Sequence, residues 1–229
     1  MSLLNDFAQL LFPSYCAGCE QLLIKGETGI CISCQFRLPR LNYNDYRGNK
    51  LEKKLWGRAD IFMATAFLQM SKSGIVHQLI HELKYHDNKN VGVHLGKLFG
   101  ASLLKSESMN QLDFIIPVPL HPKKLFKRGY NQCDCIAEGM GQAMNIEIYK
   151  NQLVRLHHNT SQTKKSRYKR WENVDGIFAI KDESALENKH VLLIDDVITT
   201  GSTIEACAHA LNRIKGLKLS VGAIAIPEN

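Results

Sequence analysis

The chain has 229 residues, of which 45% are hydrophobic and 22% charged, and its formal net charge is +7. Its composition is that of a globular protein. No stretch approaches the roughly 18 consecutive apolar residues of a membrane span, and the first 13 residues lack the basic start and cleavage site of a secretory signal. From these features we expect a chain that neither spans a membrane nor is exported, and therefore a cytoplasmic protein.

The positive charge is concentrated in two segments. Residues 121–130 and 150–170 together hold eleven of the 29 Lys and Arg residues and no Asp or Glu. Two basic segments fit a compact polyanion such as a pyrophosphate, and they also fit a nucleic-acid strand. Charge alone does not separate these two ligands.

The pattern of apolar residues predicts alternating strands and helices. Helical spacing predicts a short amphipathic helix at the N-terminus that packs on the body of the protein, and further helices over 74–86, 91–105, 131–145 and 202–216. Apolar runs predict strands over 64–70, 113–120, 175–180, 190–197 and 219–226. Such alternation is typical of an α/β fold with a mainly parallel sheet flanked by helices.

The order of these segments predicts two parts joined by a linker. Residues 1–40 form an N-terminal helix and a cysteine module, 41–60 are polar and form the linker, and 61–229 form the main domain.

Four cysteines are spaced as two CxxC pairs separated by eleven residues: Cys16, Cys19, Cys31 and Cys34. Two short turns that each present two thiolates suit tetrahedral Zn²⁺, and without an export signal a metal is favoured over disulfides. Four thiolates leave no position open for water, so the zinc is expected to be structural. We interpret Cys133, Cys135 and Cys207 as ordinary helix residues.

The strongest functional signal is the string VLLIDDVITTGST at residues 191–203. A buried strand ends in Asp195 and Asp196, and open α/β sheets bind ligands at the carboxyl ends of their strands. The loop and helix start that follow are rich in hydroxyls, and their free N–H groups form an anion site. This part comprises Thr199, Thr200, Gly201, Ser202 and Thr203. The carboxylates would repel a phosphate, so we expect them to face ribose hydroxyls or Mg²⁺.

A second strand leads into the basic segment PVPLHPKKLFKRGYNQ at residues 117–132. We expect a loop that carries Lys123, Lys124, Lys127 and Arg128, with Gly129 permitting a tight turn. This loop should leave the same sheet edge as the Asp pair and bind a pyrophosphate. A solvated basic loop without a ligand is the alternative.

Two further features are weaker signals. Residues 157–170 are polar, and Lys164, Lys165 and Arg167 would repel one another in an empty site, so we expect a lid that closes over an anionic ligand. The alternative is a solvated surface loop. His77 and His81 have the spacing of metal ligands on a helix, but with no carboxylate at useful spacing we favour surface or packing roles.

The string VLLIDDVITTGST resembles the phosphoribosyl pyrophosphate signature of type I phosphoribosyltransferases. Together with residues 117–132, the stretch LIHELKYH and the paired CxxC, the chain resembles the ComF/GntX family of competence-associated proteins. The resemblance implies a five-stranded parallel core with a hood. It further implies that Asp195 and Asp196 contact the ribose hydroxyls and that residues 199–203 hold the 5-phosphate. Lys127, Arg128 and Gly129 would lie near the pyrophosphate.

Two functions follow from this resemblance. The first is a phosphoribosyltransferase that binds phosphoribosyl pyrophosphate and Mg²⁺ and transfers the phosphoribosyl group to an unidentified acceptor. The second is a non-catalytic module of DNA uptake that binds single-stranded DNA or a competence helicase.

Overall fold

The computed structural model describes residues 13–42, 47–156 and 177–228. Its centre is a five-stranded sheet with the strand order β1-β7-β6-β2-β3, in which every neighbouring pair is parallel. The strands are β1 (Met63–Met70), β2 (Phe114–Pro117), β3 (Glu147–Ile148), β6 (His190–Val197) and β7 (Lys218–Pro227). The predicted parallel α/β fold is therefore confirmed.

Strand β6 runs through the middle of the sheet and is buried on both faces. Leu192 and Ile194 pack in one apolar core, and Val191 and Leu193 pack in the core on the opposite face. Successive side chains of a strand point to opposite faces, so an uninterrupted apolar run is what a doubly covered strand requires. The run ends where β6 reaches the carboxyl edge of the sheet.

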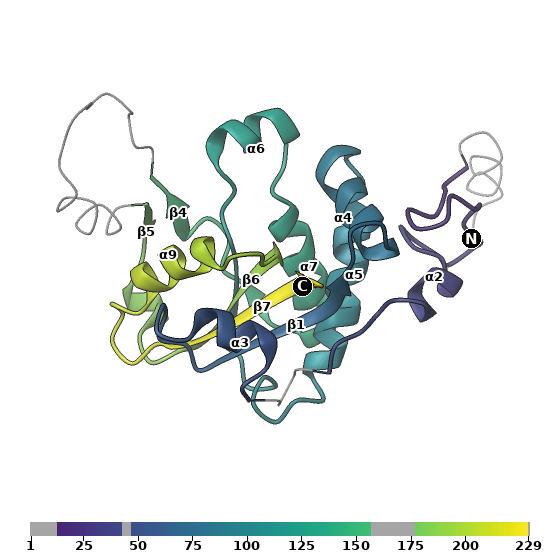
Figure 1. Ribbon diagram of the computed structural model, residues 1–229. Helices are drawn as coiled ribbons and strands as arrows, with labels where there is room; N and C mark the ends of the chain where they lie inside the picture. The colour runs from purple at the N-terminus through teal and green to yellow at the C-terminus, as the bar shows by residue number, and fades with distance from the viewer. Residues whose placement is uncertain (1–12, 43–46, 157–176, 229) are drawn as a thin grey trace.

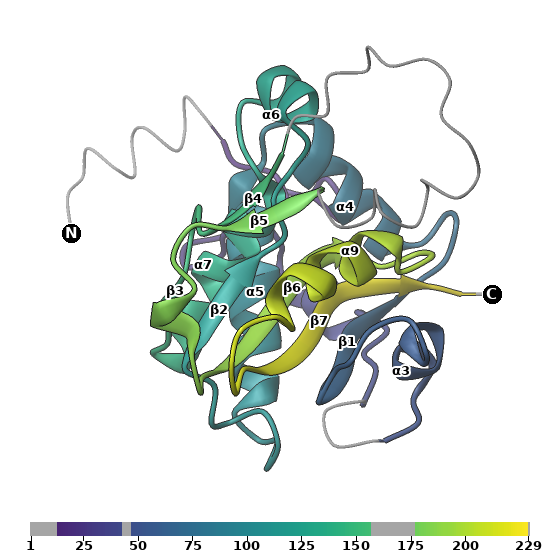
Figure 2. The same ribbon diagram turned by 90° about the vertical axis from the view of Figure 1, so that its left-hand side faces the viewer.

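Helices cover both faces of this sheet (Figures 1 and 2). One core contains α4 (Ile75–Tyr85), α5 (Lys89–Leu103) and α7 (Gln132–Met144), and the other contains α3 (Lys50–Leu55) and α9 (Ser202–Leu211). Helices α5 and α7 pack closely because glycines lie at their contact. A Cβ atom added to Gly96 would collide with the carbonyl of Ile136, and one added to Gly139 would collide with that of Val93.

Two smaller elements project from the body. The helix α6 (Pro122–Arg128) has no buried residue and stands out between β2 and α7 (Figure 1). The strands β4 (Leu153–Arg155) and β5 (Phe178–Ile180) form a separate antiparallel pair, followed by the short helix η2 (Ser184–Leu186).

The segment that carries the four cysteines packs directly against α4 and α5. It contains the short helix α2 (Ile32–Phe36), and its Cys16 and Cys34 belong to the same apolar core as Val76 of α4 and Val91 of α5. His94 Nε2 lies 3.0 Å from Gln35 Oε1, which adds a polar contact across the junction.

The segment that the sequence suggests as a linker contains helix α3. The side chains of Leu51 and Leu55 are fully buried in the core beneath α9. The Asn49 side chain caps the helix by accepting hydrogen bonds from the backbone N–H groups of Leu51 and Glu52, at 2.9 and 3.1 Å. A capped turn with apolar residues four apart forms a helix here despite the polar composition of the segment.

Other differences concern the ends of elements. The helix predicted over 202–216 ends at Leu211, and the strand predicted over 113–120 ends at Pro117. The amphipathic N-terminal helix falls outside the described residues. No helix in the described part of the chain is both long and apolar enough to cross a membrane.

Candidate functional site

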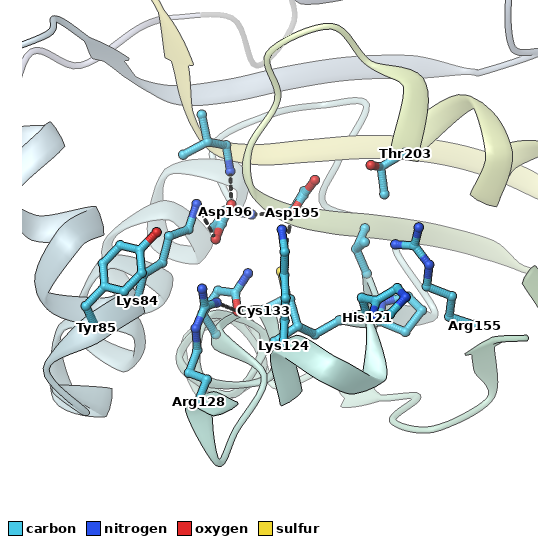
Figure 3. Close-up of a pocket in the computed structure, with 15 residues that line it drawn as sticks. Lys84, Tyr85, His121, Lys124, Arg128, Cys133, Arg155, Asp195, Asp196 and Thr203 are labelled. Atoms are coloured by element: carbon cyan, nitrogen blue, oxygen red, sulfur yellow. Dashed lines mark hydrogen bonds and ion pairs between the residues drawn. The ribbon is translucent and has the colours of Figure 1, made fainter. Parts of the chain in front are cut away.

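The two carboxylates predicted from the sequence lie at the carboxyl end of β6 (Figure 3). Asp195 Oδ1 accepts a hydrogen bond from the Asp196 backbone N–H at 2.8 Å and another from the Cys133 thiol at 3.4 Å. Asp196 Oδ1 accepts one from the Val197 N–H at 2.6 Å. These contacts hold both side chains at fixed positions on the sheet edge.

A lysine from the neighbouring helix balances the charge of the pair. Lys84 Nζ of α4 lies 2.9 Å from Asp196 Oδ2, with both side chains largely buried. That oxygen is buried and accepts no hydrogen bond of regular geometry within the described part of the chain, so its contact there is the ion pair with Lys84. A cation that reaches it from the cavity would compete with the Lys84 ammonium.

Burial raises the pKa of Asp195 to about 7, and the negative charge of Asp196 acts in the same direction. The hydrogen bonds from the Asp196 N–H and the Cys133 thiol, and the charge of Lys84, oppose the rise. Desolvation disfavours the charged form of a carboxyl group, and a second carboxylate adjacent to it does the same. Asp195 consequently exchanges a proton near neutral pH.

We expect this carboxyl to make folding stability depend on pH. Its pKa of about 7 exceeds the value of 3.8 that an unperturbed Asp has, so the folded chain binds the proton more tightly than the unfolded chain. The resulting stabilisation is complete below pH 3.8 and is lost as the pH rises through about 7. Denaturant unfolding of wild type and Asp195→Asn across this range checks the effect.

The free energy of unfolding of wild type, relative to that of Asp195→Asn, should fall as the pH rises. The fall should be at most about 1.4 kcal/mol per pH unit. Asp195→Asn has a neutral side chain of the same shape and lacks this proton. A difference between the two proteins that is constant from pH 4 to pH 8 would show that Asp195 does not titrate here.

The loop after the carboxylates leads into the N-terminus of α9. Gly201 has a φ of +81°, a conformation that favours glycine, and α9 begins at the next residue, Ser202. Thr200 Oγ1 and Ser202 Oγ lie 3.2 Å apart, so two hydroxyls gather at the helix start. The free N–H groups of such a terminus make it a ready anion site.

Two cations from outside the motif fix this loop. Lys54 Nζ of α3 donates a hydrogen bond to the Thr199 carbonyl at 2.9 Å. Arg58 donates to the Thr200 carbonyl and forms an ion pair with Glu205 of α9 at 2.6 Å. Both residues were missed in the sequence because they lie in the expected linker. Asn49, as a helix cap, and Leu51 and Leu55, spaced four apart, are a signal from which a helix in this segment could have been predicted.

A cavity of about 250 Å³ opens beside the carboxylates. Of the residues predicted to form the site, Asp195, Asp196, Thr203 and Arg128 line it. Lys124, which the sequence places in the basic segment, lines it as well. Its wall also includes basic residues that were not predicted to form the site: Lys84, His121 and Arg155. Figure 3 shows the carboxylates facing basic side chains that come from α4, α6 and β4. The cavity thus combines two acids with an array of cations, as a ligand with both hydroxyls and phosphates requires.

The basic segment forms a helix rather than the expected loop. His121 caps α6 with its side chain, Pro122 occupies the first turn, and Gly129 ends the helix at a φ of +80°. These are the residues that start and stop a helix. Lys127 and Arg128 line a second cavity of about 340 Å³, to which Lys84 and Tyr85 also contribute.

The remaining predicted residues divide into two groups. Thr199, Thr200, Gly201 and Ser202 form the loop and helix start next to Thr203. Lys164, Lys165 and Arg167 lie outside the described residues, so the lid stays a prediction.

The four module cysteines converge on one point. Their sulfur atoms all lie within 4.8 Å of one another, and the Cys19 and Cys31 sulfurs are 3.7 Å apart. Burial alone would raise the pKa of Cys16. Hydrogen bonds from three backbone N–H groups outweigh this effect and lower the pKa to about 7. Burial and the neighbouring thiols raise the pKa of Cys34 to about 12. Such a group can hold a tetrahedral metal ion, whose charge would stabilise four thiolates together.

The chain is similar to known proteins in the region of the site and over most of its length. Residues 145–226 match the phosphoribosyl transferase domain model. The chain is 24% identical to competence protein F of Haemophilus influenzae over 225 residues, which cover 93% of this chain and 97% of that protein. It is 26% identical to the DNA utilization protein YhgH of Escherichia coli K12 over 219 residues, or 89% of this chain and 93% of that protein.

A solved structure of glutamine phosphoribosylpyrophosphate amidotransferase from B. subtilis has a TM-score of 0.46 and 18% identity, covering 64% of this chain and 30% of that chain. The parallel sheet, its flanking helices and the family match define a phosphoribosyltransferase-type domain. Over most of its length the chain is similar to competence protein F and to YhgH, and it carries a four-cysteine cluster near its N-terminus. The resemblance seen in the sequence is thereby confirmed.

Proposed function

We propose that the cavity at the end of β6 binds 5-phosphoribosyl pyrophosphate together with Mg²⁺. The Asp195 and Asp196 carboxylates accept hydrogen bonds from the ribose hydroxyls. The hydroxyls and N–H groups of residues 199–203 hold the 5-phosphate, and the basic wall that includes Arg128 receives the pyrophosphate.

One observation carries this proposal: two fixed carboxylates and several cations face each other across the same small cavity. Asp195 and Asp196 exclude a simple phosphate from their side, whereas Lys124 and Arg128 of α6 attract one on the other. A ribose with free hydroxyls on C2 and C3, a pyrophosphate on C1 and a phosphate on C5 meets both requirements. The anion-binding helix terminus beside the carboxylates adds the place for the second phosphate.

The residues present fit a magnesium ion. Mg²⁺ binds through one or two carboxylates, with phosphate oxygens and water completing its shell. The buried Asp196 Oδ2 is an oxygen that already pairs with a cation, the Lys84 ammonium, which Mg²⁺ would displace. When bound, the ion would neutralise charge on the departing pyrophosphate.

Transfer of the phosphoribosyl group requires breaking the bond between the anomeric carbon and the pyrophosphate oxygen. The pyrophosphate leaves with the electron pair, and the basic wall stabilises its charge. The carboxylates orient the ribose while positive charge develops at the anomeric carbon. An acceptor nucleophile forms the new bond, and no described residue identifies that acceptor.

Arg128 provides a direct test of the basic wall. We expect Arg128→Ala to weaken phosphoribosyl pyrophosphate binding about 10- to 100-fold, because a hydrogen bond to a charged group is worth about 1.5–3 kcal/mol. Isothermal calorimetry with Mg²⁺ measures the change. Lys123→Ala is the matched control, since this lysine is exposed on the same helix and lines neither cavity. Equal affinities of the two variants would contradict the assignment.

Binding and turnover can be separated in one experiment. The protein is mixed with phosphoribosyl pyrophosphate, Mg²⁺ and individual nucleobases, and both the thermal shift and the released pyrophosphate are measured. A magnesium-dependent thermal shift supports binding, and pyrophosphate release with one base identifies the acceptor. Absence of any shift at millimolar ligand would refute the proposed function.

We also propose that the four-cysteine cluster holds a structural Zn²⁺ within the module of residues 1–40. Backbone N–H groups and a guanidinium approach its sulfurs: Gly18 N and Cys31 N to Cys16 Sγ at 3.3 and 3.2 Å, Cys34 N to Cys31 Sγ at 3.4 Å, and Arg37 Nη2 to Cys34 Sγ at 3.3 Å. Hydrogen bonds of this kind stabilise thiolate ligands.

A second function, binding of single-stranded DNA, is favoured by the surface of α6. Phe126 is 93% exposed on this helix, between Lys124 and Lys127. An exposed aromatic ring among cations suits a stacked base beside a phosphate backbone. Affinity for an oligonucleotide should fall steeply from low to physiological salt, and a flat dependence would count against this function.

A further inference from the structure

Two histidines and a glutamate, side chains of types that can ligate metals, converge at the carboxyl end of α4, outside the cavity and the cysteine cluster. His81 and Glu82 belong to the helix, and His86 is its C-cap residue. One ligand atom from each lies within 4.8 Å of the other two. The sequence pairs His81 with His77 by helical spacing, but in the structure the partners of His81 are Glu82 and His86.

The geometry of the three side chains brings their donor atoms together at the surface. His86 Nδ1 lies 2.6 Å from Glu82 Oε1, which places the carboxylate beside one imidazole. The rings of His81 and His86 meet edge to face, with centroids 5.1 Å apart and an interplanar angle of 86°. Both histidines are exposed, so an ion can reach them without local unfolding.

We infer that His81, Glu82 and His86 form a second zinc site, distinct from the cysteine cluster. Two imidazoles and one carboxylate are a ligand set that Zn²⁺ uses with its fourth position left to water or another ligand. A simple ion pair between His86 and Glu82 is the competing explanation, because exposed pairs of this kind are common. The ion pair does not require His81, and the zinc site does.

The position of the site suggests what the metal does. Between its ligands lie Lys84 and Tyr85, which line the cavity described above. The Tyr85 ring lies 4.8 Å from the His81 ring, and the Arg128 guanidinium lies over it at 5.7 Å from the centroid. An ion that bridges the last turn of α4 and its cap residue would restrict the movement of the backbone that carries Lys84 and Tyr85 on the cavity wall. The site itself does not depend on the proposed ligand of that cavity.

The test is a calorimetric titration of the full chain with Zn²⁺, after its tightly held metal has been quantified and loosely held metal removed. Wild type should bind one further equivalent. His81→Ala and His86→Ala should each lose it, and the control His77→Ala, changed at an exposed position on the same helix, should keep it. Circular dichroism checks that α4 remains folded in each variant.

Cobalt gives an independent readout of the ligands. Co²⁺ added to the zinc-loaded protein should produce the weak visible bands of nitrogen and oxygen ligands without a thiolate charge-transfer band. Absence of a further equivalent in wild type would overturn the inference. Loss of binding in His86→Ala but not in His81→Ala would also overturn it, because a three-ligand site needs both.

Discussion

Replacing both carboxylates at the end of β6 should abolish magnesium-dependent binding of phosphoribosyl pyrophosphate. In Asp195→Asn/Asp196→Asn we expect at least about a 100-fold loss of affinity, since two charged hydrogen bonds to the ribose are each worth about 1.5–3 kcal/mol. The amides keep the shape of the carboxyls, so the backbone at the sheet edge is retained. Calorimetry with and without Mg²⁺ measures the loss.

The matched control for this variant is Glu138→Gln, which removes one negative charge from an exposed position on α7. It should bind as wild type does. Circular dichroism and thermal unfolding check that the double variant remains folded. Unchanged affinity in the folded double variant would mean that the ligand, if bound, lies elsewhere.

Removing one cysteine of the cluster should release the metal and destabilise the chain. Cys19→Ser is expected to lose about one equivalent of zinc, because three thiolates hold the ion much less tightly and binding is coupled to folding of such modules. The module shares a core with α4 and α5, so the loss should spread beyond it. With at least about 3 kcal/mol lost, the melting temperature should fall by roughly 6–12 °C.

Cys135→Ser is the control for the cysteine variant. Cys135 is buried in α7, away from the cluster, so this change can lower stability but should leave the zinc content at one equivalent. Elemental analysis therefore distinguishes loss of a ligand from loss of packing. A wild-type protein without zinc, or a Cys19→Ser protein of unchanged stability, would contradict the structural role.

The fold and the acidic half of the site were predictable because their signals are local. A fully apolar run that ends in Asp195 and Asp196 predicts a buried central strand and its functional end. The residues that follow predict a loop and a helix start, and the structure begins α9 at Ser202. The CxxC spacing likewise predicts a metal cluster without knowledge of the packing.

The rest of the site depends on contacts between distant segments. Lys84 reaches Asp196 only because α4 packs beside the carboxyl end of β6, and no pattern around Lys84 indicates that partner. Cys133 looks like an ordinary helix residue in the sequence, yet its thiol contacts Asp195. Arg58 anchors the hydroxyl-rich loop from a segment whose polar composition hides a helix.

The most direct test of the central proposal is a crystal structure of the protein soaked with phosphoribosyl pyrophosphate and Mg²⁺. We predict the ribose hydroxyls on Asp195 and Asp196, the 5-phosphate on residues 199–203, and the pyrophosphate toward Lys84 and Arg128. A structure with this ligand bound at another place, or with an empty cavity at saturating ligand concentration, would contradict the account.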